Sequence, residues 1–366
     1  MGISHIGTND LLIILDRPGS WMLVDVRSRE EFAEWNIPVA VNIPLEDVEL
    51  HLDELRGRDL YLICAKGPRS ERAADLLDSH GLSSIVVDGG MESWANTYDT
   101  VSLDVGTVRI VQLRRRGKGC LSYVIGSGSA CVVLDPPRDT SHSEAIARAN
   151  GWGITVVADT HMHADHVSGA VTLAQRHNAM LVLNERDDYT IDAGTPFQGA
   201  LDIGGKAPFR LDRLATPGHT MGSSTYALGQ AALFTGDTLF VNNVGRPDLA
   251  DNAMVFAQEL YDSLHQQILS FPASTLLFPA HVSQDIEIHG DVMVTTTLGD
   301  ALETIPVLSM NRQQFVATTA GRAVPRPPNA EVIVAANREG GLLPLDEVLG
   351  LETGPNRCAA ATSIAS

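Results

Sequence analysis

The sequence predicts an α/β protein with two domains, and three observations support this prediction. First, the chain has 366 residues, which is more than a single domain usually contains. Second, short apolar runs alternate with helix-forming segments through the first hundred residues, which is typical of a doubly wound α/β domain with a parallel sheet. Third, later apolar runs end in loops that carry histidine and aspartate, as a metal site built on a sheet requires.

The composition is that of an ordinary soluble globular protein, with 44% hydrophobic and 19% charged residues. The formal net charge of -19 argues against nucleic acid as a partner, because phosphates bind to basic surfaces. No apolar run is long enough to cross a bilayer, and the first residues lack the pattern of a secretory signal. The four cysteines form no disulfide framework. We therefore expect a cytoplasmic protein that binds neither membranes nor nucleic acid.

The predicted N-terminal domain comprises residues 1–99. Residues 22–26 read as a strand, and Ser28-Arg29-Glu30-Glu31 is a capping-box signature for the start of a helix. Further strands are expected at residues 39–43, 60–63 and 85–87, and a helix at residues 70–77. In a doubly wound sheet, ligands bind at the carboxyl ends of the strands. The loop after residues 60–63 is therefore the place to look for chemistry.

That loop is Cys64-Ala65-Lys66-Gly67-Pro68-Arg69-Ser70. A cysteine under a helix N-terminus faces unpaired backbone N–H groups and the positive end of the helix dipole, and Lys66 and Arg69 add positive charge. These groups favour the thiolate, which is a nucleophile, and they also suit the charged terminal sulfur of a persulfide. A buried structural cysteine is an equally good interpretation of this loop taken alone.

Three motifs of the first domain together resemble a single-domain rhodanese: Asp25-Val26-Arg27, the Cys64 loop, and Val87-Asp88-Gly89-Gly90-Met91 followed by Trp94. The resemblance implies that Cys64 carries sulfane sulfur as a persulfide and that Arg69 belongs to the catalytic loop. Residues 35–40 depart from the family's Gly-His-Ile-Pro-Gly-Ala pattern, which is mainly structural in the family. The activity prediction therefore stands.

The second predicted domain comprises residues 105–350. Residues 96–104 are polar without clear periodicity, and we place a linker at residues 100–104 and a flexible tail at residues 351–366. Residues 108–113, 121–125 and 130–134 read as a β meander, followed by a helix at residues 143–149. Cys120 and Cys131 lie in or beside these strands, and we interpret both as packing residues.

The densest group of metal-capable side chains is His161-Met162-His163-Ala164-Asp165-His166, directly after a strand-like run at residues 154–158. Three more such residues, each following a short apolar run, are His219, Asp237 and His281. Histidine is the commonest protein metal ligand, and ligands at several strand ends can meet at one point. The sequence therefore predicts a metal site.

The order and spacing of these groups resemble the metallo-β-lactamase superfamily over residues 105–340: H-x-H-x-D-H, then Gly-His, Gly-Asp and Pro-x-His. The resemblance implies an αββα sandwich and leaves two interpretations of the centre. In one, all seven groups (His161, His163, Asp165, His166, His219, Asp237, His281) hold two zinc ions, as in a glyoxalase II-like thioesterase. In the other, the superfamily's persulfide dioxygenases imply one Fe(II) on His161, His219 and Asp237, with His163, Asp165, His166 and His281 orienting the ligands.

Three features favour the dioxygenase. The fused sulfurtransferase handles persulfides, and Gly245-Arg246-Pro247-Asp248 resembles the Gly-Arg-Thr-Asp of persulfide dioxygenases, whose arginine contacts the thiol carrier. Residues 294–299 and the run around Pro306 and Phe315 resemble the same family, whereas the helical glutathione-binding domain of a glyoxalase II is not evident. The expected function is oxidation of a low-molecular-weight thiol persulfide by O2 to sulfite and the free thiol, in hydrogen sulfide metabolism. Cys64 is expected either to take sulfane sulfur from thiosulfate or to transfer it to sulfite, and the sequence does not decide the direction.

The thiol that carries the persulfide is left open. Thr220 and Arg246 match the family's carrier site, but Ser283 and Val307 stand where glutathione-using relatives have tyrosine and arginine. Glutathione is the family default, and coenzyme A, mycothiol and bacillithiol are alternatives. A homodimer is frequent in the superfamily, and the sequence neither supports nor excludes it. A non-catalytic sulfur-binding scaffold or sensor is a third interpretation, against which the complete ligand set and the intact Cys64 loop both argue.

Overall fold

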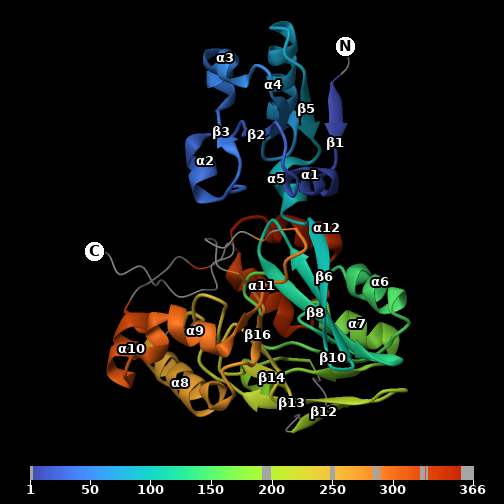
Figure 1. Ribbon diagram of the computed structural model, residues 1–366, viewed down its shortest axis with the longest axis vertical. Coiled ribbons are helices and arrows are strands. Elements are labelled where there is room, and N and C mark those ends of the chain that lie inside the picture. Colours follow the sequence, from blue (N-terminus) through green and yellow to red (C-terminus); the bar gives the residue numbers. More distant parts are fainter. Residues whose placement is uncertain are drawn as a thin grey trace.

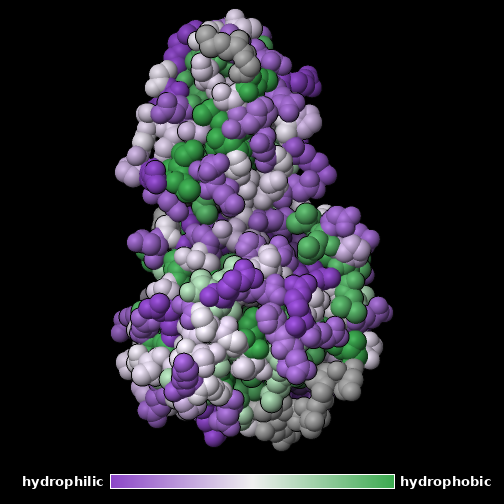
Figure 2. All heavy atoms as spheres, turned by 90° about the vertical axis from the view of Figure 1, so that its right-hand side faces the viewer, coloured by the Kyte–Doolittle hydropathy of each residue, from purple (hydrophilic) through white to green (hydrophobic). Residues whose placement is uncertain are grey.

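The computed structural model describes residues 3–191, 199–247, 252–282, 288, 290–321, 326 and 329–355. It divides into a smaller N-terminal part and a larger second part, which Figure 1 shows at the top and bottom of the view. Figure 2 shows hydrophilic side chains over most of one face, with apolar residues in small groups. In the described part of the chain, no helix is long and apolar enough to cross a membrane.

The N-terminal domain is a five-stranded parallel sheet in the order β1-β5-β4-β2-β3, which confirms the predicted doubly wound class. The strands are β1 Ser4–Ile6, β2 Trp21–Asp25, β3 Val41–Asn42, β4 Asp59–Ile63 and β5 Ser84–Val87. The helices are α1 Thr8–Leu15, α2 Arg29–Glu34, α3 Leu52–Leu55, α4 Pro68–Ser79 and α5 Gly90–Trp94, with the 3-10 helix η1 Leu45–His51 before α3. Separate apolar clusters pack α4 and η1 on one face of the sheet and α1 and α5 on the other.

The second domain contains two six-stranded sheets that pack face to face. The first, in the order β11-β10-β9-β8-β7-β6, consists of β6 Tyr98–Val105, β7 Val108–Arg115, β8 Cys120–Ser127, β9 Ala130–Leu134, β10 Gly153–Ala158 and β11 Met180–Val182. The second, in the order β12 to β17, consists of β12 Ala200–Ile203, β13 Phe209–Ala215, β14 Ser224–Leu228, β15 Ala232–Gly236, β16 Leu276–Pro279 and β17 Thr296–Thr297.

Helices cover the outer face of each sheet, which gives the predicted αββα sandwich (Figure 1). The first sheet packs against α6 Ser141–Ala149 and α7 Ala170–His177, and the second against α8 Ala253–Gln266, α9 Leu298–Thr304 and α10 Arg312–Ala320. The last helices, α11 Ala330–Arg338 and α12 Leu345–Leu351, pack on Val167 in the metal loop. Three short 3-10 helices complete the fold: η2 Glu185–Asp187, η3 Ile268–Ser270 and η4 Pro306–Ser309.

The predicted linker at residues 100–104 is wrong, because these residues form most of strand β6, which pairs with β7 along its whole length. Val101 is buried and Leu103 and Val105 are half-buried, whereas Thr100, Ser102 and Asp104 are exposed. This is the alternation of a strand with one covered face. The second domain therefore begins at about Tyr98, directly after the N-terminal domain.

The predicted tail also begins too early. α12 extends to Leu351, and the next residue, Glu352, is buried. Its carboxylate forms an ion pair with the buried Arg115 and accepts a hydrogen bond from the Val167 backbone N–H at 2.6 Å. A buried arginine requires such a partner, and this requirement fixes Glu352 in the fold.

The two domains meet at the β7–β8 turn, residues 116–119. The Trp35 indole N–H donates to the Gly117 carbonyl at 3.2 Å, and the Arg116 guanidinium forms an ion pair with Asp16 at 2.9 Å. Gly117 lies so close to α5 that an added Cβ would be 2.1 Å from the Trp94 carbonyl oxygen. A side chain at this position would push the domains apart.

Candidate metal centre

Five loops that leave carboxyl ends of strands meet at one edge of the sandwich. They follow β9, β10, β13, β15 and β16, and they bring Asp135, the 159–166 segment, His219, Asp237 and His281 together. All of these side chains are buried. The structure therefore gathers the seven predicted groups in one place, although they are spread over 120 residues of sequence.

The turn into Asp237 depends on Gly236. Its φ is 54°, in the left-handed region, and an added Cβ would lie 2.7 Å from the Thr160 hydroxyl. Glycine alone adopts this conformation at low cost and allows the Asp237 loop to approach the histidine loop. This explains the Gly-Asp pair in the sequence.

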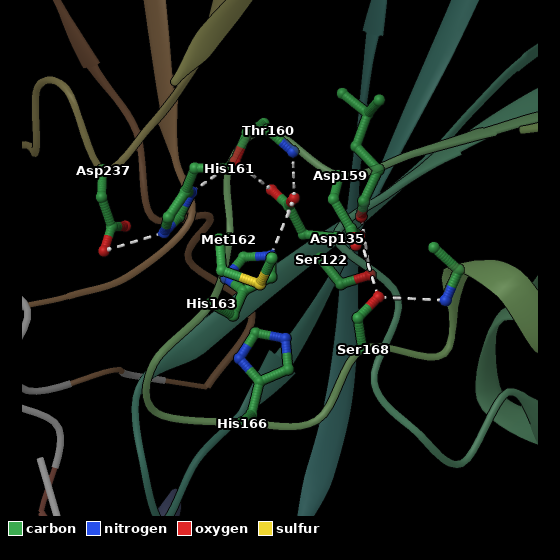
Figure 3. Close-up of polar contacts among 12 residues, drawn as sticks. Ser122, Asp135, Asp159, Thr160, His161, Met162, His163, His166, Ser168 and Asp237 are labelled. Carbon is green, nitrogen blue, oxygen red and sulfur yellow. Dashed lines mark hydrogen bonds and ion pairs between the residues drawn. The ribbon is translucent and has the colours of Figure 1, made fainter. Parts of the chain in front are cut away.

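Hydrogen bonds fix which ring nitrogen of His161 faces inward. The Thr160 hydroxyl donates to Asp135 Oδ2 at 3.0 Å and lies 2.9 Å from His161 Nδ1, so it accepts the Nδ1 proton. The Nε2 atom of His161 then carries a lone pair, and this buried atom has no hydrogen-bond partner. Figure 3 shows the ring directed toward Asp237, and Nε2 lies 3.6 Å from Asp237 Oδ2.

His219 is arranged in the same way. Its Nδ1 donates to the Arg246 backbone carbonyl at 3.0 Å, and its Nε2 lies 3.4 Å from Asp237 Oδ2. Burial lowers the pKa of His219 to about 4, so the ring is neutral at physiological pH. Neutral imidazole is the form that binds metals.

The donor set of His161, His219 and Asp237 fits a metal ion. Their ligand atoms lie within 4.8 Å of one another, and both His161 Nε2 and Asp237 Oδ2 are buried without a hydrogen-bond partner among the described residues. Buried polar atoms are normally satisfied, and a metal ion bound by the three side chains would satisfy both of these atoms at once. Two histidines and one carboxylate leave open coordination positions.

A second group lies beside the first and consists of Cys120, Asp165, His166 and His281. His281 joins the two groups: its Nδ1 lies 2.6 Å from Asp237 Oδ1 and its Nε2 lies 2.9 Å from Asp165 Oδ2. Cys120 Sγ lies 3.2 Å from Asp165 Oδ2. The prediction that Cys120 is a packing residue is wrong, because β8 begins next to the metal loop. Cys131 does pack in an apolar cluster, and burial raises the pKa of its thiol to about 12.

His163 faces a third group that the sequence analysis missed. Its Nε2 lies 3.1 Å from Asp135 Oδ1, and Asp159 completes this buried group of possible ligands (Figure 3). Burial, together with the neighbouring His166 and His161, lowers the pKa of His163 to about 3, so the ring is neutral and donates Nε2–H to Asp135. Its Nδ1 is buried without a partner. Asp135 ends strand β9, and this strand-end position was the available signal in the sequence.

Two further polar residues, also missed, hold the ligand loops in place. Asp187 accepts hydrogen bonds from the backbone N–H groups of Met162 at 2.8 Å and Gly222 at 2.7 Å, so it ties the first histidine loop to the His219 loop. Asn337 on α11 donates to the carbonyls of His163 and His166, both at 2.9 Å, and accepts from the Ser168 N–H at 2.8 Å. No sequence pattern marks either residue, because both act across long stretches of chain.

A cavity of about 280 Å3 opens beside His219. Met162, Met221 and Phe256 give it an apolar wall, and Arg186 and Arg338 lie on its lining, as does the predicted substrate-binding residue Thr220. The Thr220 hydroxyl donates to Asp187 at 3.1 Å. The cavity is therefore a pocket next to the metal position whose apolar wall is accompanied by both arginine side chains and the acidic residues Asp187, Asp188 and Glu331.

The other residues compared with the family's thiol-carrier site do not line this cavity in the described part of the chain. Arg246 is buried and its backbone holds His219, but its side chain is not among the described residues that line the cavity. Val307 is buried in the apolar cluster under α8 to α10. Asp248, Ser283 and the proline-rich residues 324, 325, 327 and 328 lie outside the described residues.

In the first domain, Cys64 directly follows β4 and lies under the N-terminus of α4, as predicted. The Gly67 N–H lies 3.1 Å from Cys64 Sγ, and the Ser70 hydroxyl is buried without a hydrogen-bond partner among the described residues. Burial acts to raise the pKa of the Cys64 thiol, but the nearby Ser70 hydroxyl and the backbone N–H groups of the loop outweigh it and lower the pKa. The loop thus favours a thiolate.

Arg69 forms a bidentate ion pair with Glu31, at 2.6 and 2.8 Å. This pair lowers the pKa of Glu31 to about 2, and the same carboxylate accepts the Ser28 N–H in the capping box of α2. Arg69 is therefore oriented by Glu31, and its side chain is half-buried.

Two family models match the chain. The Rhodanese-like domain model matches residues 9–97, and the Metallo-beta-lactamase superfamily model matches residues 115–281. Both agree with the division of the fold described above.

Persulfide dioxygenases and hydroxyacylglutathione hydrolases are among the proteins to which this chain is similar. The mitochondrial persulfide dioxygenase ETHE1 of Mus musculus is 28% identical over 231 residues, which are 62% of this chain and 86% of that protein. The hydroxyacylglutathione hydrolase of Acidiphilium cryptum is 38% identical over 128 residues, but these are only 34% of this chain and 51% of that protein. The crystal structure of ETHE1 from Myxococcus xanthus superposes with a TM-score of 0.56 at 28% identity and covers 63% of this chain and 99% of that chain. The chain therefore consists of a rhodanese-like domain followed by a metallo-beta-lactamase superfamily domain, and it is homologous to the persulfide dioxygenases.

Proposed function

We propose that this protein oxidises a low-molecular-weight thiol persulfide with O2, using one iron(II) held by His161, His219 and Asp237. The observation that carries the proposal is the buried set of two imidazole nitrogens and one carboxylate oxygen, with two of these atoms unsatisfied, beside a cavity. Iron(II) bound there would supply adjacent open positions for the persulfide sulfur and for dioxygen. The similarity to persulfide dioxygenases along 86% of the mouse protein supports the same reaction.

The overall reaction converts R–S–SH, O2 and H2O into R–SH, sulfite and two protons. The four electrons that reduce dioxygen come from the terminal sulfur, which ends as sulfite. The chain's own residues orient the ligands through Thr160, Asp135 and the Arg246 carbonyl. The apolar wall of Met162, Met221 and Phe256 keeps water away from the reacting sulfur, and Arg186 and Arg338 would attract anionic groups of the carrier thiol.

We further propose that Cys64 transfers sulfane sulfur. The Cys64 thiolate attacks the outer sulfur of thiosulfate and releases sulfite, and the resulting persulfide passes that sulfur to an acceptor thiol. The same steps run in reverse when sulfite accumulates, so the relative concentrations of thiosulfate and sulfite decide the direction. Cys64→Ser should abolish sulfur transfer from thiosulfate without lowering oxygen uptake on added persulfide. Sulfur transfer that survives this substitution would refute the assignment.

The decisive experiment is metal analysis of anaerobically purified protein combined with oxygen uptake on addition of glutathione persulfide. About one iron per chain, with rapid uptake and sulfite release, is the expected result. The competing function is a thioesterase with two zinc ions that share a hydroxide, which the partial similarity to a hydroxyacylglutathione hydrolase suggests. Two zinc ions, thioester hydrolysis and no oxygen consumption with any thiol persulfide would establish that function instead. Coenzyme A persulfide should be tested in parallel with glutathione persulfide.

A further inference from the structure

A buried arginine at the end of β7, Arg115, contacts two parts of the chain that are far apart in the sequence. Its side chain is only 1% exposed. Its Nε donates to the Ala95 carbonyl at 2.6 Å, and its Nη2 donates to Asn96 Oδ1 at 2.5 Å. Its Nη1 donates to the Glu352 carboxylate, with which it forms an ion pair. All three nitrogens of this guanidinium therefore bind groups inside the fold.

The first two contacts of Arg115 lead to the Cys64 loop through α5. The residues that it contacts directly follow this helix, which lies at the end of the N-terminal domain that faces the second domain (Figure 1). At the other end of α5, the Met91 N–H donates to the Cys64 carbonyl at 2.8 Å. The Glu92 N–H donates to the Ala65 carbonyl at 3.1 Å. One end of α5 thus holds the backbone of the loop that carries the sulfur, and Arg115 holds the other end.

Gly90, at the start of α5, shows how closely the helix approaches this loop. Its φ is 56°, and an added Cβ would lie 2.2 Å from the Cys64 carbonyl oxygen. Only glycine fits here at low cost. Because the two backbones are in direct contact, a movement of the Cys64 loop must move α5 with it.

The third contact of Arg115 leads to the metal loop. Glu352 Oε1 accepts a hydrogen bond from the Val167 N–H at 2.6 Å, directly after His166. Lys118 also holds this segment, because its buried Nζ donates to the Glu352 carbonyl at 2.7 Å. A buried carboxylate requires a cationic partner. Arg115 therefore keeps Glu352 in the position from which it binds the metal loop.

We propose that Arg115 and Glu352 are positioning residues that couple the Cys64 loop to the metal loop. The contacts run from the Cys64 carbonyl through α5 to Arg115, and from there through Glu352 to the backbone beside His166. When a metal ion orders the metal loop, these contacts should hold the Cys64 loop with its N–H groups toward the sulfur. The proposal requires that the described donors bind a metal ion, and it does not depend on which reaction that ion supports.

The chemistry of arginine allows this coupling to be separated from simple charge compensation. Arg115→Lys keeps the positive charge that Glu352 needs, but it loses the planar set of donors that also binds the residues after α5. Arg109→Lys is a matched control. Arg109 lies on the same strand and also forms an ion pair, with Asp104, but both of these side chains are exposed.

The test compares alkylation of Cys64 by iodoacetamide at neutral pH in the metal-free full chain and after addition of cobalt(II), with mass spectrometry of the Cys64 peptide. Cobalt(II) should raise the rate about 2- to 30-fold, the size of effect that coupled networks produce, because the ordered loop favours the thiolate. Arg115→Lys should lose this response, and Arg109→Lys should keep it. His219→Ala, which lacks a metal ligand, should not respond, and this excludes cobalt bound at Cys64 itself as the cause.

Three results would overturn the proposal. These are a Cys64 rate that does not rise with cobalt(II) in the unmodified protein, a response that survives Arg115→Lys, or a response in His219→Ala. A purely structural role of Arg115 would lower the free energy of unfolding in urea but leave the response intact, so the two roles are distinguished. If Arg115→Lys does not fold, as judged by circular dichroism, Asn96→Ala replaces it. That variant removes one contact next to α5, keeps the ion pair with Glu352, and must reduce the response for the proposal to stand.

Discussion

At the scale of single residues, hydrogen bonds decide which nitrogen of each histidine faces the first metal position. Thr160 is central to this, because its hydroxyl donates to Asp135 and therefore accepts from His161 Nδ1. The Arg246 carbonyl has the same role for His219. Such partners of metal-binding histidines typically change metal affinity by about 10- to 100-fold when they are removed.

Thr160→Val should therefore weaken metal binding about 10- to 100-fold while the protein stays folded, because valine has the same shape but leaves His161 free to change tautomer. Competition with a chelator measures the affinity. Thr155→Val is a matched control, since Thr155 lies on β10 just before the loop that carries Thr160, and its hydroxyl donates to the Cys131 carbonyl, away from the metal. Equal affinities for the two variants would contradict the role given to Thr160.

The lowered pKa of Cys64 gives a second prediction at this scale. The thiolate is the reactive form, so alkylation of Cys64 by iodoacetamide should increase with pH and reach half its maximum below pH 9.0. Ser70→Ala removes the hydroxyl that stabilises the thiolate and should move the midpoint upward. Trypsin digestion and mass spectrometry identify the alkylated residue. A midpoint at or above 9.0 in the unmodified protein would contradict the thiolate assignment.

Sequence patterns reveal residues whose spacing is local and miss residues that act across the fold. The His161 loop, His219, Asp237 and His281 each follow a strand, so their chemistry could be predicted from short motifs. Three residues that contact the His161 loop are distant from it in sequence. Cys120 is 45 residues from its partner in that loop, Asp187 is 25 residues away and Asn337 is 174 residues away. Only the tertiary structure brings these groups together.

At the scale of elements, helix α11 holds the histidine loop through Asn337. Its amide makes three hydrogen bonds to main-chain groups between His163 and Ser168, and it is buried.

The polar segment of residues 98–105 shows why a strand can be missed in the sequence. Its alternation was hidden by charged and hydroxyl residues on the exposed face, and pairing with β7 decided its structure.

Asn337→Ala should destabilise the second domain by about 1 to 3 kcal/mol, because buried backbone groups of the metal loop lose their partner. It should also weaken metal binding, since the loop carries His161. Urea denaturation and chelator competition measure the two effects. Asn150→Ala is the control: Asn150 makes one hydrogen bond, to Ile146, at the end of α6. A smaller loss of stability and unchanged metal affinity are expected there.

At the scale of the whole molecule, a small set of polar contacts joins the two domains. The Arg116–Asp16 ion pair is the most prominent of these, and the Gly290 N–H also donates to Asp16. Burial acts to raise the pKa of Asp16, but Arg116 outweighs it and the net pKa is lowered. The pair therefore stabilises the docked arrangement at neutral pH, and the contribution is lost as the pH falls through the lowered pKa.

Asp16→Asn should weaken the coupling between the domains by about 0.5 to 1 kcal/mol at neutral pH, as expected for a partly exposed ion pair. Calorimetry should then show greater separation between the unfolding transitions of the two domains. The difference from the unmodified protein should begin to shrink as the pH falls below 3.8, where Asp16 of the unfolded chain becomes protonated, and should vanish once the pH passes the lowered pKa of the folded protein. Asp53→Asn, which removes a fully exposed carboxylate in α3, should have no such effect.

The β7–β8 turn and the first residue of β8 contact the rhodanese-like domain and the metal loop within four residues. Gly117 accepts the Trp35 indole N–H of the rhodanese-like domain, and Cys120 lies against Asp165 of the metal centre. Thermodynamic linkage is reciprocal: if the sulfur state of Cys64 changes metal affinity through this turn, metal occupancy changes the affinity of Cys64 for sulfur by the same factor. If the two proposed sites are coupled in this way, the occupancy of each would therefore report on the occupancy of the other.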